Sequence, residues 1–292
     1  SLLRGAQSLF GLKTQLQFGR LSLTGILSRQ QGKSESIKVE NGFQGREFEI
    51  IASDYDENRH FFLGHYFRDN YEKWLKSLPL VSSGVNVNRV EVYVLNRTNN
   101  SESLRNFIGL TDLAEGTKIL ASGNPFIGSG ISGPNDNSSN SLFQNLIDNN
   151  SIRNVNLVND VLTNQFILSK TTDFEKVTSA RKLDNDEYVV NNSLGYISLL
   201  RRLQNDEVLA VSYEYTFNGN VHKVGELSED YQNKSDDEII ILKLLRPSNI
   251  NTEIFTWDLM MKNIYNLNVT QIENENFDLK IYYRDDAIGF NN

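Results

Sequence analysis

The sequence has 292 residues, a formal net charge of −8 and no cysteine. This length suits one large folded body or two of ordinary size, and a content of 39% hydrophobic and 10% aromatic residues argues against disorder over most of the chain. The acidic balance disfavours nucleic acid and anionic membrane surfaces as partners. The lack of cysteine excludes disulfides, thiolate nucleophiles and cysteine zinc sites.

The first residues and the hydropathy of the chain bear on its context. The chain begins Ser1-Leu2-Leu3, with neither an initiator methionine nor a signal segment. No apolar run approaches the roughly eighteen residues that a membrane-spanning helix needs. We therefore expect the sequence to be a piece of a longer protein.

Residues 1–30 predict an amphipathic β-hairpin. Apolar and polar residues alternate from Leu12 to Phe18, the pair Gly19-Arg20 marks a tight turn, and the alternation resumes at Leu21. Strands of about ten residues, at about 3.3 Å per residue and a tilt near 40°, cross about 25 Å, the height of an outer-membrane barrel wall. An ordinary hairpin of a soluble sheet has the same pattern, so both interpretations stay open.

Residues 31–292 predict a β-rich, sandwich-like body with a few helices. It begins with a second hairpin over residues 36–52, which turns at Asn41-Gly42. We expect a helix near residues 59–77 and a flexible loop near residues 121–141, where prolines and glycines gather.

The segment before this helix resembles the start of a calcium loop. Asp54, Asp56 and Asn58 stand at alternate positions, but the glycine and the glutamate that such a loop needs are replaced by Arg59 and His65. A zinc helix needs histidines four residues apart, whereas the two histidines in this region are five apart. The segment therefore predicts a turn without a metal.

The helix itself shows one apolar stripe. Leu63, Phe67, Trp74 and Leu78 recur at nearly helical spacing, and Pro79 marks the end. The pattern predicts four to five helical turns whose apolar face packs in a core.

Further strands and helices follow from alternation and helical spacing. The predicted strands cover residues 85–97, 195–200, 206–217, 220–227, 238–246 and 277–284. The predicted helical segments cover residues 140–168 and 256–267. In the strand at 206–217, Leu209, Val211 and Tyr213 share a face that must be buried.

One glycine motif has the spacing of a dinucleotide fingerprint. Gly128, Gly130 and Gly133 match it, but that motif needs a buried strand before it and a helix after it. Pro134 follows directly, within an Asn- and Ser-rich loop. We do not expect a nucleotide site, and no other cofactor is indicated.

Catalytic residues are not apparent. A Ser-His-Asp arrangement has only His60, His65 and His222 to draw on, no Gly-x-Ser-x-Gly elbow occurs, and His222 lies in an alternating strand where a structural role is expected. Acidic residues cluster at strand ends and turns, where solvated charge or loose calcium binding is the alternative to catalysis. These clusters are Asp206-Glu207, Asp236-Asp237-Glu238 and Asp285-Asp286.

Several stretches together resemble the SprA/Sov family, the outer-membrane translocon of the bacterial type IX secretion system. They are KTQLQFGRLSLTGILSRQQ, FEIIASDYDENRHFFLGHYFRDNYEKWLKSLPLV, VNRVEVYVLNR, NDEVLAVSYEYTFNG, LKLLRP and WDLMMKNIYNL. They cover roughly half the chain in the family's order.

The resemblance implies a very large outer-membrane β-barrel with folded insertions. The implied activity is export of folded proteins, with a link to gliding motility, and no enzymatic chemistry. The implied partners are the rest of the barrel polypeptide, type IX secretion proteins, exported cargo and outer-membrane lipid, and the insertion domain is expected on the extracellular side.

The resemblance also implies roles for individual residues. The hairpin face toward lipid or barrel packing would be Leu12, Leu16, Phe18, Leu21 and Leu23. The aqueous face would be Lys13, Gln15 and Gln17. The packing or docking face of the helix would be Phe61, Phe62, Tyr66, Phe67 and Trp74.

The main alternative is a free-standing β-sandwich binding module. It would hold a carbohydrate or a cell-surface protein and use exposed tyrosine and tryptophan side chains as stacking platforms. A carboxylate-dependent glycosidase is a further alternative, and it would need one of the acidic clusters to act as the catalytic pair.

Overall fold

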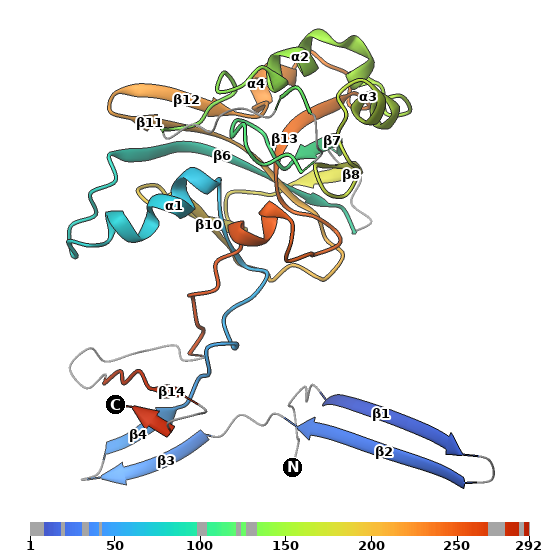
Figure 1. The fold of residues 1–292 in the computed structure, drawn as a ribbon. Helices are drawn as coiled ribbons and strands as arrows, with labels where there is room; N and C mark the ends of the chain where they lie inside the picture. The colour runs from blue at the N-terminus through green and yellow to red at the C-terminus, as the bar shows by residue number, and fades with distance from the viewer. Residues whose placement is uncertain are drawn as a thin grey trace. The chain divides into compact units, whose positions relative to one another are not determined.

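The computed structural model describes residues 9–18, 21–30, 35–40, 43–97, 104–120, 124–126, 133–267, 278–285 and 289–291. The chain forms two compact units (Figure 1). Unit 1 consists of Ser1–Asp54 and Tyr265–Asn292, and unit 2 consists of Tyr55–Ile264. The predicted division at residue 30, between a barrel wall and an inserted domain, stays a prediction.

The described residues of unit 1 form three antiparallel strand pairs. The pairs are β1 (Leu9–Phe18) with β2 (Leu21–Gln30), β3 (Glu35–Glu40) with β4 (Phe43–Phe48), and β14 (Tyr283–Asp285) with β15 (Gly289–Asn291). The two predicted N-terminal hairpins are thus confirmed, while their turn residues lie outside the described part of the chain. The strand predicted at 277–284 is shorter than expected, because only its last residues pair with a neighbour.

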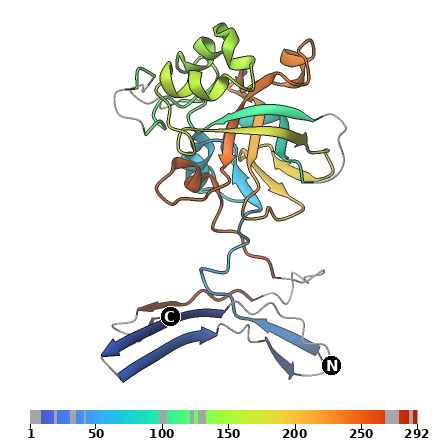
Figure 2. The ribbon, with the colours of Figure 1, turned by 90° about the vertical axis from the view of Figure 1, so that its right-hand side faces the viewer.

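The main sheet of unit 2 closes into a small barrel (Figures 1 and 2). Its strands are β6 (Val85–Leu95), β7 (Arg105–Leu110), β8 (Phe174–Lys182), β11 (Leu209–Phe217), β12 (Asn220–Val224) and β13 (Ile239–Arg246). Pairing runs from β11 through β13, β7, β8 and β6 and returns to β11. The expected sandwich is wrong, because β11 pairs with β13 on one side and with β6 on the other.

The interior of this barrel is one apolar cluster to which all five strands of the ring contribute. Its members are Tyr93, Phe107, Val177, Ala180, Val208, Ala210, Ile240, Leu242 and Leu244, with Tyr231 from a short helix. A Cβ at Gly109 would lie 2.9 Å from Leu244 Cδ1, so the close packing of the interior requires glycine at this position.

The outer face of the barrel carries a second, larger apolar cluster. Val90, Val92 and Val94 of β6 belong to it, whereas Tyr93 belongs to the interior cluster. The alternation of β6 and β11 is therefore confirmed on both faces, because the barrel interior covers one face and helices and loops cover the other.

A three-stranded sheet and a helix pack on this outer cluster. The strands β5 (His60–Phe62), β10 (Tyr196–Leu199) and β9 (Tyr188–Asn191) pair in that order, and the helix α1 spans His65–Trp74. The predicted helix started too early, because residues 60–62 pair with β10 and Gly64 precedes the first helical turn in an extended conformation.

The predicted apolar stripe of this helix ends early as well. Leu63, Phe67 and Trp74 are buried, but Leu78 is 64% exposed. The helix ends at Trp74 with Leu75 as its C-cap, so Leu78 no longer follows the helical period that would bring it to the core.

The remaining helices are short. They are α2 (Leu142–Asp148), α3 (Val158–Asn164), α4 (Ser228–Tyr231) and the 3-10 turns η1 (Asn150–Arg153) and η2 (Phe255–Leu259). The helical prediction for residues 140–168 is confirmed. The one for residues 256–267 holds only through Leu259, because Met260 instead forms a β-bridge with Phe61. No helix in the described part of the chain is long and apolar enough to cross a membrane.

The predicted loop at 121–141 is described only in part. Residues 124–126 and 133–141 form neither helix nor strand. The segment around Asn137 is fixed to β12 of the barrel, since its side chain accepts from Gly225 N at 2.8 Å and its backbone N–H donates to Lys223 O at 2.8 Å. Most of the glycine motif lies outside the described residues.

Candidate functional site

Two of the three residues that resembled a calcium loop, Asp56 and Asn58, bind arginines. The Asp56 carboxylate accepts from Arg59 Nη1 at 3.1 Å and from Arg202 Nη2 at 2.7 Å, while Asn58 Oδ1 accepts from Arg246 Nε at 2.9 Å. Within the described residues, no group of three or more metal-ligating side chains converges. Because their oxygens face cationic side chains, Asp56 and Asn58 are committed to ion pairing and hydrogen bonding.

A serine, a histidine and an aspartate do form a chain of contacts in this region. His60 Nδ1 lies 2.7 Å from Ser198 Oγ, and His60 Nε2 lies 3.3 Å from Asp56 Oδ2. Residue spacing could not predict this arrangement, because Ser198 is 138 residues away from His60. The order of groups is the one that hydrolases use to activate a serine.

Two features favour a structural role for these Ser198, His60 and Asp56 contacts. Ser198 belongs to β10, the middle strand of its sheet, with β5 on one side and β9 on the other. A hydrolase instead exposes its serine at a sharp turn beside free backbone N–H donors that stabilise an oxyanion. Asp56 also shares its carboxylate with two guanidinium groups. The contacts therefore join β5, β10 and the segment at Arg202.

A second buried cluster surrounds Glu115. Its carboxylate accepts from the backbone N of His65 at 2.8 Å, lies 2.8 Å from His65 Nδ1, and pairs with Lys243 Nζ at 2.8 Å. Lys243 comes from the outward face of β13 and is fully buried, and it also donates to the carbonyl oxygen of Thr111. Every charged group in this cluster thus has an oppositely charged or hydrogen-bonding partner, as buried charge requires.

Burial and ion pairing shift the pKa values in these two clusters. Burial alone would raise the pKa of Glu115, but Lys243 and His65 outweigh it and hold this pKa well below its usual range. Burial lowers the pKa of His60, and Asp56 only partly opposes the shift. At neutral pH both groups are therefore in the protonation state that the fold favours.

We expect the free energy of unfolding to fall as the pH drops from 7 to 4. His60 has a lowered pKa in the folded state, so below its ordinary value of 6.5 the unfolded chain binds more protons. The lowered pKa of Glu115 adds a further loss below 4.5. Asp112, whose pKa burial raises, opposes this trend, but the lowered pKa values of Glu91 and Glu207 add to it.

Urea unfolding at several pH values measures this dependence. In a His60→Gln variant, the loss between pH 6.5 and 5 should shrink while the loss below pH 4.5 remains. An unfolding free energy that rises on acidification would contradict the assignment of both groups.

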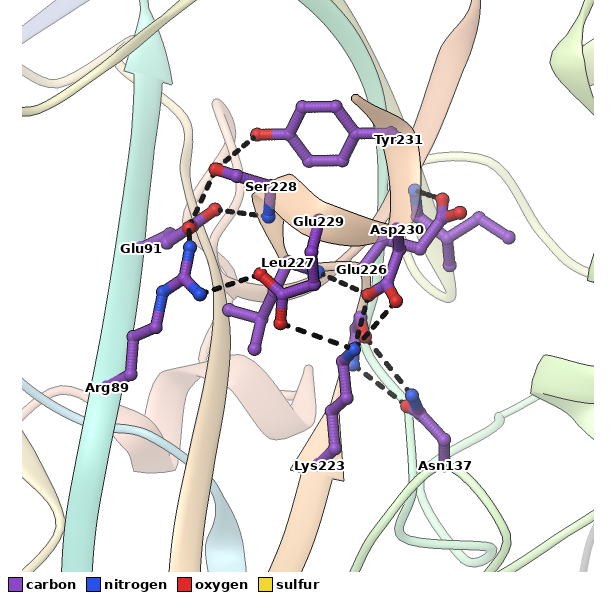
Figure 3. Close-up of polar contacts among 12 residues, drawn as sticks. Arg89, Glu91, Asn137, Lys223, Glu226, Leu227, Ser228, Glu229, Asp230 and Tyr231 are labelled. Atoms are coloured by element: carbon purple, nitrogen blue, oxygen red, sulfur yellow. Dashed lines mark hydrogen bonds and ion pairs between the residues drawn. The ribbon is translucent and has the colours of Figure 1, made fainter. Parts of the chain in front are cut away.

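A third cluster surrounds Glu91 and the short helix α4 (Figure 3). Glu91 on β6 accepts from Ser228 N at 3.1 Å and from Ser228 Oγ at 2.7 Å at the start of α4. It also accepts from Tyr93 at 3.0 Å, and Arg89 donates to it. The Tyr231 hydroxyl contacts that of Tyr93, so α4 is held over the barrel interior.

The same close-up shows how the loop around α4 is fixed (Figure 3). Lys223 Nζ lies 2.6 Å from Asp230 Oδ2, and Asp230 accepts from the backbone N of Leu227 at 2.8 Å. Buried Glu226 pairs with Arg153 Nη1 at 2.6 Å and accepts from Ile241 N at 2.8 Å. These contacts connect β12, α4, β13 and η1, and they leave no charged group of the loop's buried part without a partner among the described residues.

One acidic residue contradicts its predicted environment. Asp206 is exposed as expected, but the Glu207 side chain is buried and accepts from Arg201 Nη2 at 2.7 Å and from Arg201 Nη1 at 2.9 Å. Solvent exposure is expected for Glu207 because it stands at the end of a predicted strand, yet Arg201 binds both of its oxygens inside the fold. Asp286 lies outside the described residues.

One open cleft of unit 2 is polar. It has a volume of about 610 Å³ and is lined by Asn106, Asn150, Arg153, Asn154, Val155, Asn156, Thr178, Asp237 and Glu238. Stacking platforms for a sugar do not line it. Trp74 is buried, and Lys262 Nζ lies 4.5 Å from the ring centroid of Trp257. The surroundings of both tryptophans therefore do not favour a carbohydrate-binding module.

The predicted helix face lies inside unit 2. Phe61, Phe62, Phe67 and Trp74 are buried in the outer apolar cluster, and Tyr66 packs against it while partly buried. Their rings contact those of Tyr71, Tyr196, Tyr213, Tyr215 and Phe217. His222 stacks on Tyr215 with ring centroids 5.1 Å apart and lies 2.9 Å from Asp136.

The predicted wall residues are placed by the register of β1 and β2. Leu12 pairs with Leu27, Leu16 with Leu23, and Phe18 with Leu21. Lys13, Gln15 and Gln17 pair with Ile26, Thr24 and Ser22. The register thus sets the predicted apolar positions opposite one another.

The sequence did contain a signal for the charged groups that were missed. Lys243 interrupts an otherwise apolar strand, and Glu91 stands between two valines. A charge within a strand that is buried on both faces needs a buried partner. The identity of the partner, Glu115 or Ser228, could not be read from spacing.

Comparison with known proteins gives the relationships of the chain. No curated protein matches it. The model of the SprA_N family, described as "Motility related/secretion protein", matches residues 2–216, which is well over half of the chain and includes the hairpin β1–β2, α1, and β11 almost to its end. The chain therefore belongs to the SprA_N family of motility-related and secretion proteins.

Proposed function

We propose that this chain is part of a giant outer-membrane β-barrel channel that exports folded proteins through the type IX secretion system. Membership in a family of secretion and motility proteins supports this role. In the proposal, β1 and β2 are wall strands, and unit 2 is a folded body at the extracellular mouth of the pore. The partners are the rest of the barrel, other secretion proteins, the cargo and outer-membrane lipid.

The observation that carries this proposal is the geometry of the first hairpin. β1 and β2 have ten residues each and pair over their full length, with two residues between Phe18 and Leu21. Ten residues suit a tilted wall strand of about 25 Å, and wall strands alternate apolar and polar positions. The sequence assigns Leu12, Leu16 and Phe18 to the lipid or packing side, and it assigns Lys13, Gln15 and Gln17 to the water side.

The buried polar clusters support a role without chemistry. The charged groups of the Glu91, Glu115 and Glu226 clusters are bound to backbone atoms or to oppositely charged side chains of unit 2. Such saturated clusters specify one arrangement of strands and helices. Unit 2 is accordingly proposed as a mechanical part of the channel.

Cysteine labelling tests the wall placement. Because the chain has no cysteine, single cysteines at positions 12 to 18 of the full-length protein, cleared of thiols elsewhere, are labelled in intact membranes with a membrane-impermeant maleimide. We expect labelling at positions 13, 15 and 17 and protection at positions 12, 14, 16 and 18. A pattern without this two-residue period would contradict the proposal.

A control variant shows that the reagent reaches unit 2. Leu78→Cys places a thiol at a position that is 64% exposed, and it should react in intact membranes whatever the role of β1. In intact cells the same variant should react only if unit 2 faces the outside, so failure there would contradict the extracellular placement.

A further inference from the structure

The two ends of unit 2 lie side by side. The chain enters unit 2 at Tyr55 and leaves it at Ile264, and the backbone N–H of Asp56 donates to the carbonyl oxygen of Ile264 at 2.7 Å. Further in, Met261 N donates to His60 O at 2.9 Å. The first and last residues of unit 2 are therefore paired with each other.

A third segment, residues 199–203, binds the entering strand. Leu199 N donates to Arg59 O at 2.8 Å, and Leu203 N donates to Asn58 O at 2.9 Å. Arg59 Nε returns a hydrogen bond to Leu199 O at 2.8 Å. Arg202 reaches across to the Asp56 carboxylate at 2.7 Å.

The Asp56 carboxylate is the centre of these contacts. Its side chain is 4% exposed, and it accepts from Arg59, Arg202 and His60, while its own backbone N–H holds Ile264. A carboxylate so deeply placed is stable only when these partners surround it. We call Asp56, Arg59, His60, Arg202 and Ile264 the neck cluster.

The neck cluster is also fixed to the barrel. Asn58, which has a positive φ of 59°, directs its side-chain oxygen to Arg246 on β13 at 2.9 Å. Asparagine tolerates this backbone conformation better than other non-glycine residues. The turn at Asn58 thus brings the entering strand from the Asp56 carboxylate to the barrel wall.

We propose that the neck cluster locks the entering and leaving segments of unit 2 together. All the contacts that hold these two segments lie within residues 55–264. The segment of residues 55–60 is then a locking element. Without the Arg202 contact, the two segments separate locally while the barrel stays folded. This inference uses contacts inside unit 2 alone, so it does not depend on the proposed export function.

Hydrogen exchange on the full-length chain tests this lock, with adjacent arginines as a matched pair. Arg202 pairs with Asp56, whereas Arg201 pairs with Glu207, and their side chains are 53% and 54% exposed. In Arg202→Gln, we expect the amides of Asp56 and Met261 to exchange roughly threefold to tenfold faster, as loss of one partly exposed charged hydrogen bond implies. The amide of Ile241, in the barrel, should keep its protection.

The Arg201→Gln variant should leave the Asp56 and Met261 amides unchanged. Equal exchange in the two variants, or no change in Arg202→Gln, would overturn the lock. If Arg202→Gln loosens the whole of unit 2, Arg202→Lys decides the question, because lysine keeps the charge but not the planar guanidinium. In Arg202→Lys, faster exchange confined to the amides of Asp56 and Met261 supports the lock. Exchange at the wild-type rate, or faster exchange throughout unit 2, contradicts it.

Discussion

Replacing Gly195 with alanine is expected to lower the free energy of unfolding by roughly 2–5 kcal/mol. A Cβ at this position would lie 2.1 Å from Phe67 Cδ1, far inside van der Waals contact. Phe67 cannot move away, because it is buried and its ring packs against those of Trp74, Tyr213 and Tyr215 at centroid distances of 6.5, 5.9 and 5.2 Å.

A second glycine separates this overlap from backbone strain. Gly195 and Gly219 both have positive φ, 65° and 84°, but a Cβ at Gly219 would meet nothing within 4 Å. Gly219→Ala should therefore cost only the strain of the left-handed conformation, about 1–2 kcal/mol. Urea unfolding of both variants measures the difference. Equal losses would mean that Phe67 does not occupy the space beside Gly195.

Replacing Lys243 with methionine is expected to cost about 3–5 kcal/mol. Lys243 is fully buried, and its ammonium group is bound to Glu115 Oε2 at 2.8 Å and to the carbonyl oxygen of Thr111. Without it, the Glu115 carboxylate stays buried with only the backbone N and Nδ1 of His65 as contacts. An uncompensated buried charge is what makes the loss large.

Two comparison variants sharpen this result. Adding Glu115→Gln to Lys243→Met removes the orphaned charge, so the double variant should recover part of the lost stability. Lys223→Met breaks an ion pair with Asp230 whose side chains are each 31% exposed, and it should change stability by about 1 kcal/mol or less. A loss at Lys243 as small as that at Lys223 would show that Glu115 is not charged inside the fold.

The boundary of α1 shows where local pattern fails. The apolar stripe of Leu63, Phe67 and Trp74 was correctly expected in the core, yet residues 60–62 became strand β5. Over only three residues, a buried helical segment and a short buried strand have the same apolar pattern. The ladder partners on β10 lie more than 130 residues along the chain, so only the folded chain could decide between them.

The polar clusters show even more strongly that a local sequence pattern cannot identify contacts between distant residues. His60, Asp56 and Glu207 were all visible as titratable residues, but Ser198, Arg202 and the other partners could not be assigned. Glu207 was expected in water and is buried, because Arg201 bonds both of its oxygens. A charged side chain can be buried only where the fold brings a hydrogen-bonding or oppositely charged partner to it. A position near a turn in the sequence does not reveal whether such a partner is present.

The sequence by itself determined the hairpins β1–β2 and β3–β4, the strands β6, β10, β11, β12 and β13 of unit 2, and the family resemblance that the SprA_N match confirms. Those features rest on alternation and turn residues, which act between neighbours in the chain. Only the tertiary structure decided that β11 joins β6 and β13 into a closed barrel, and that Lys243 meets Glu115 across 128 residues. Such contacts form when distant segments pack, and their energy is absent from any local stretch of sequence.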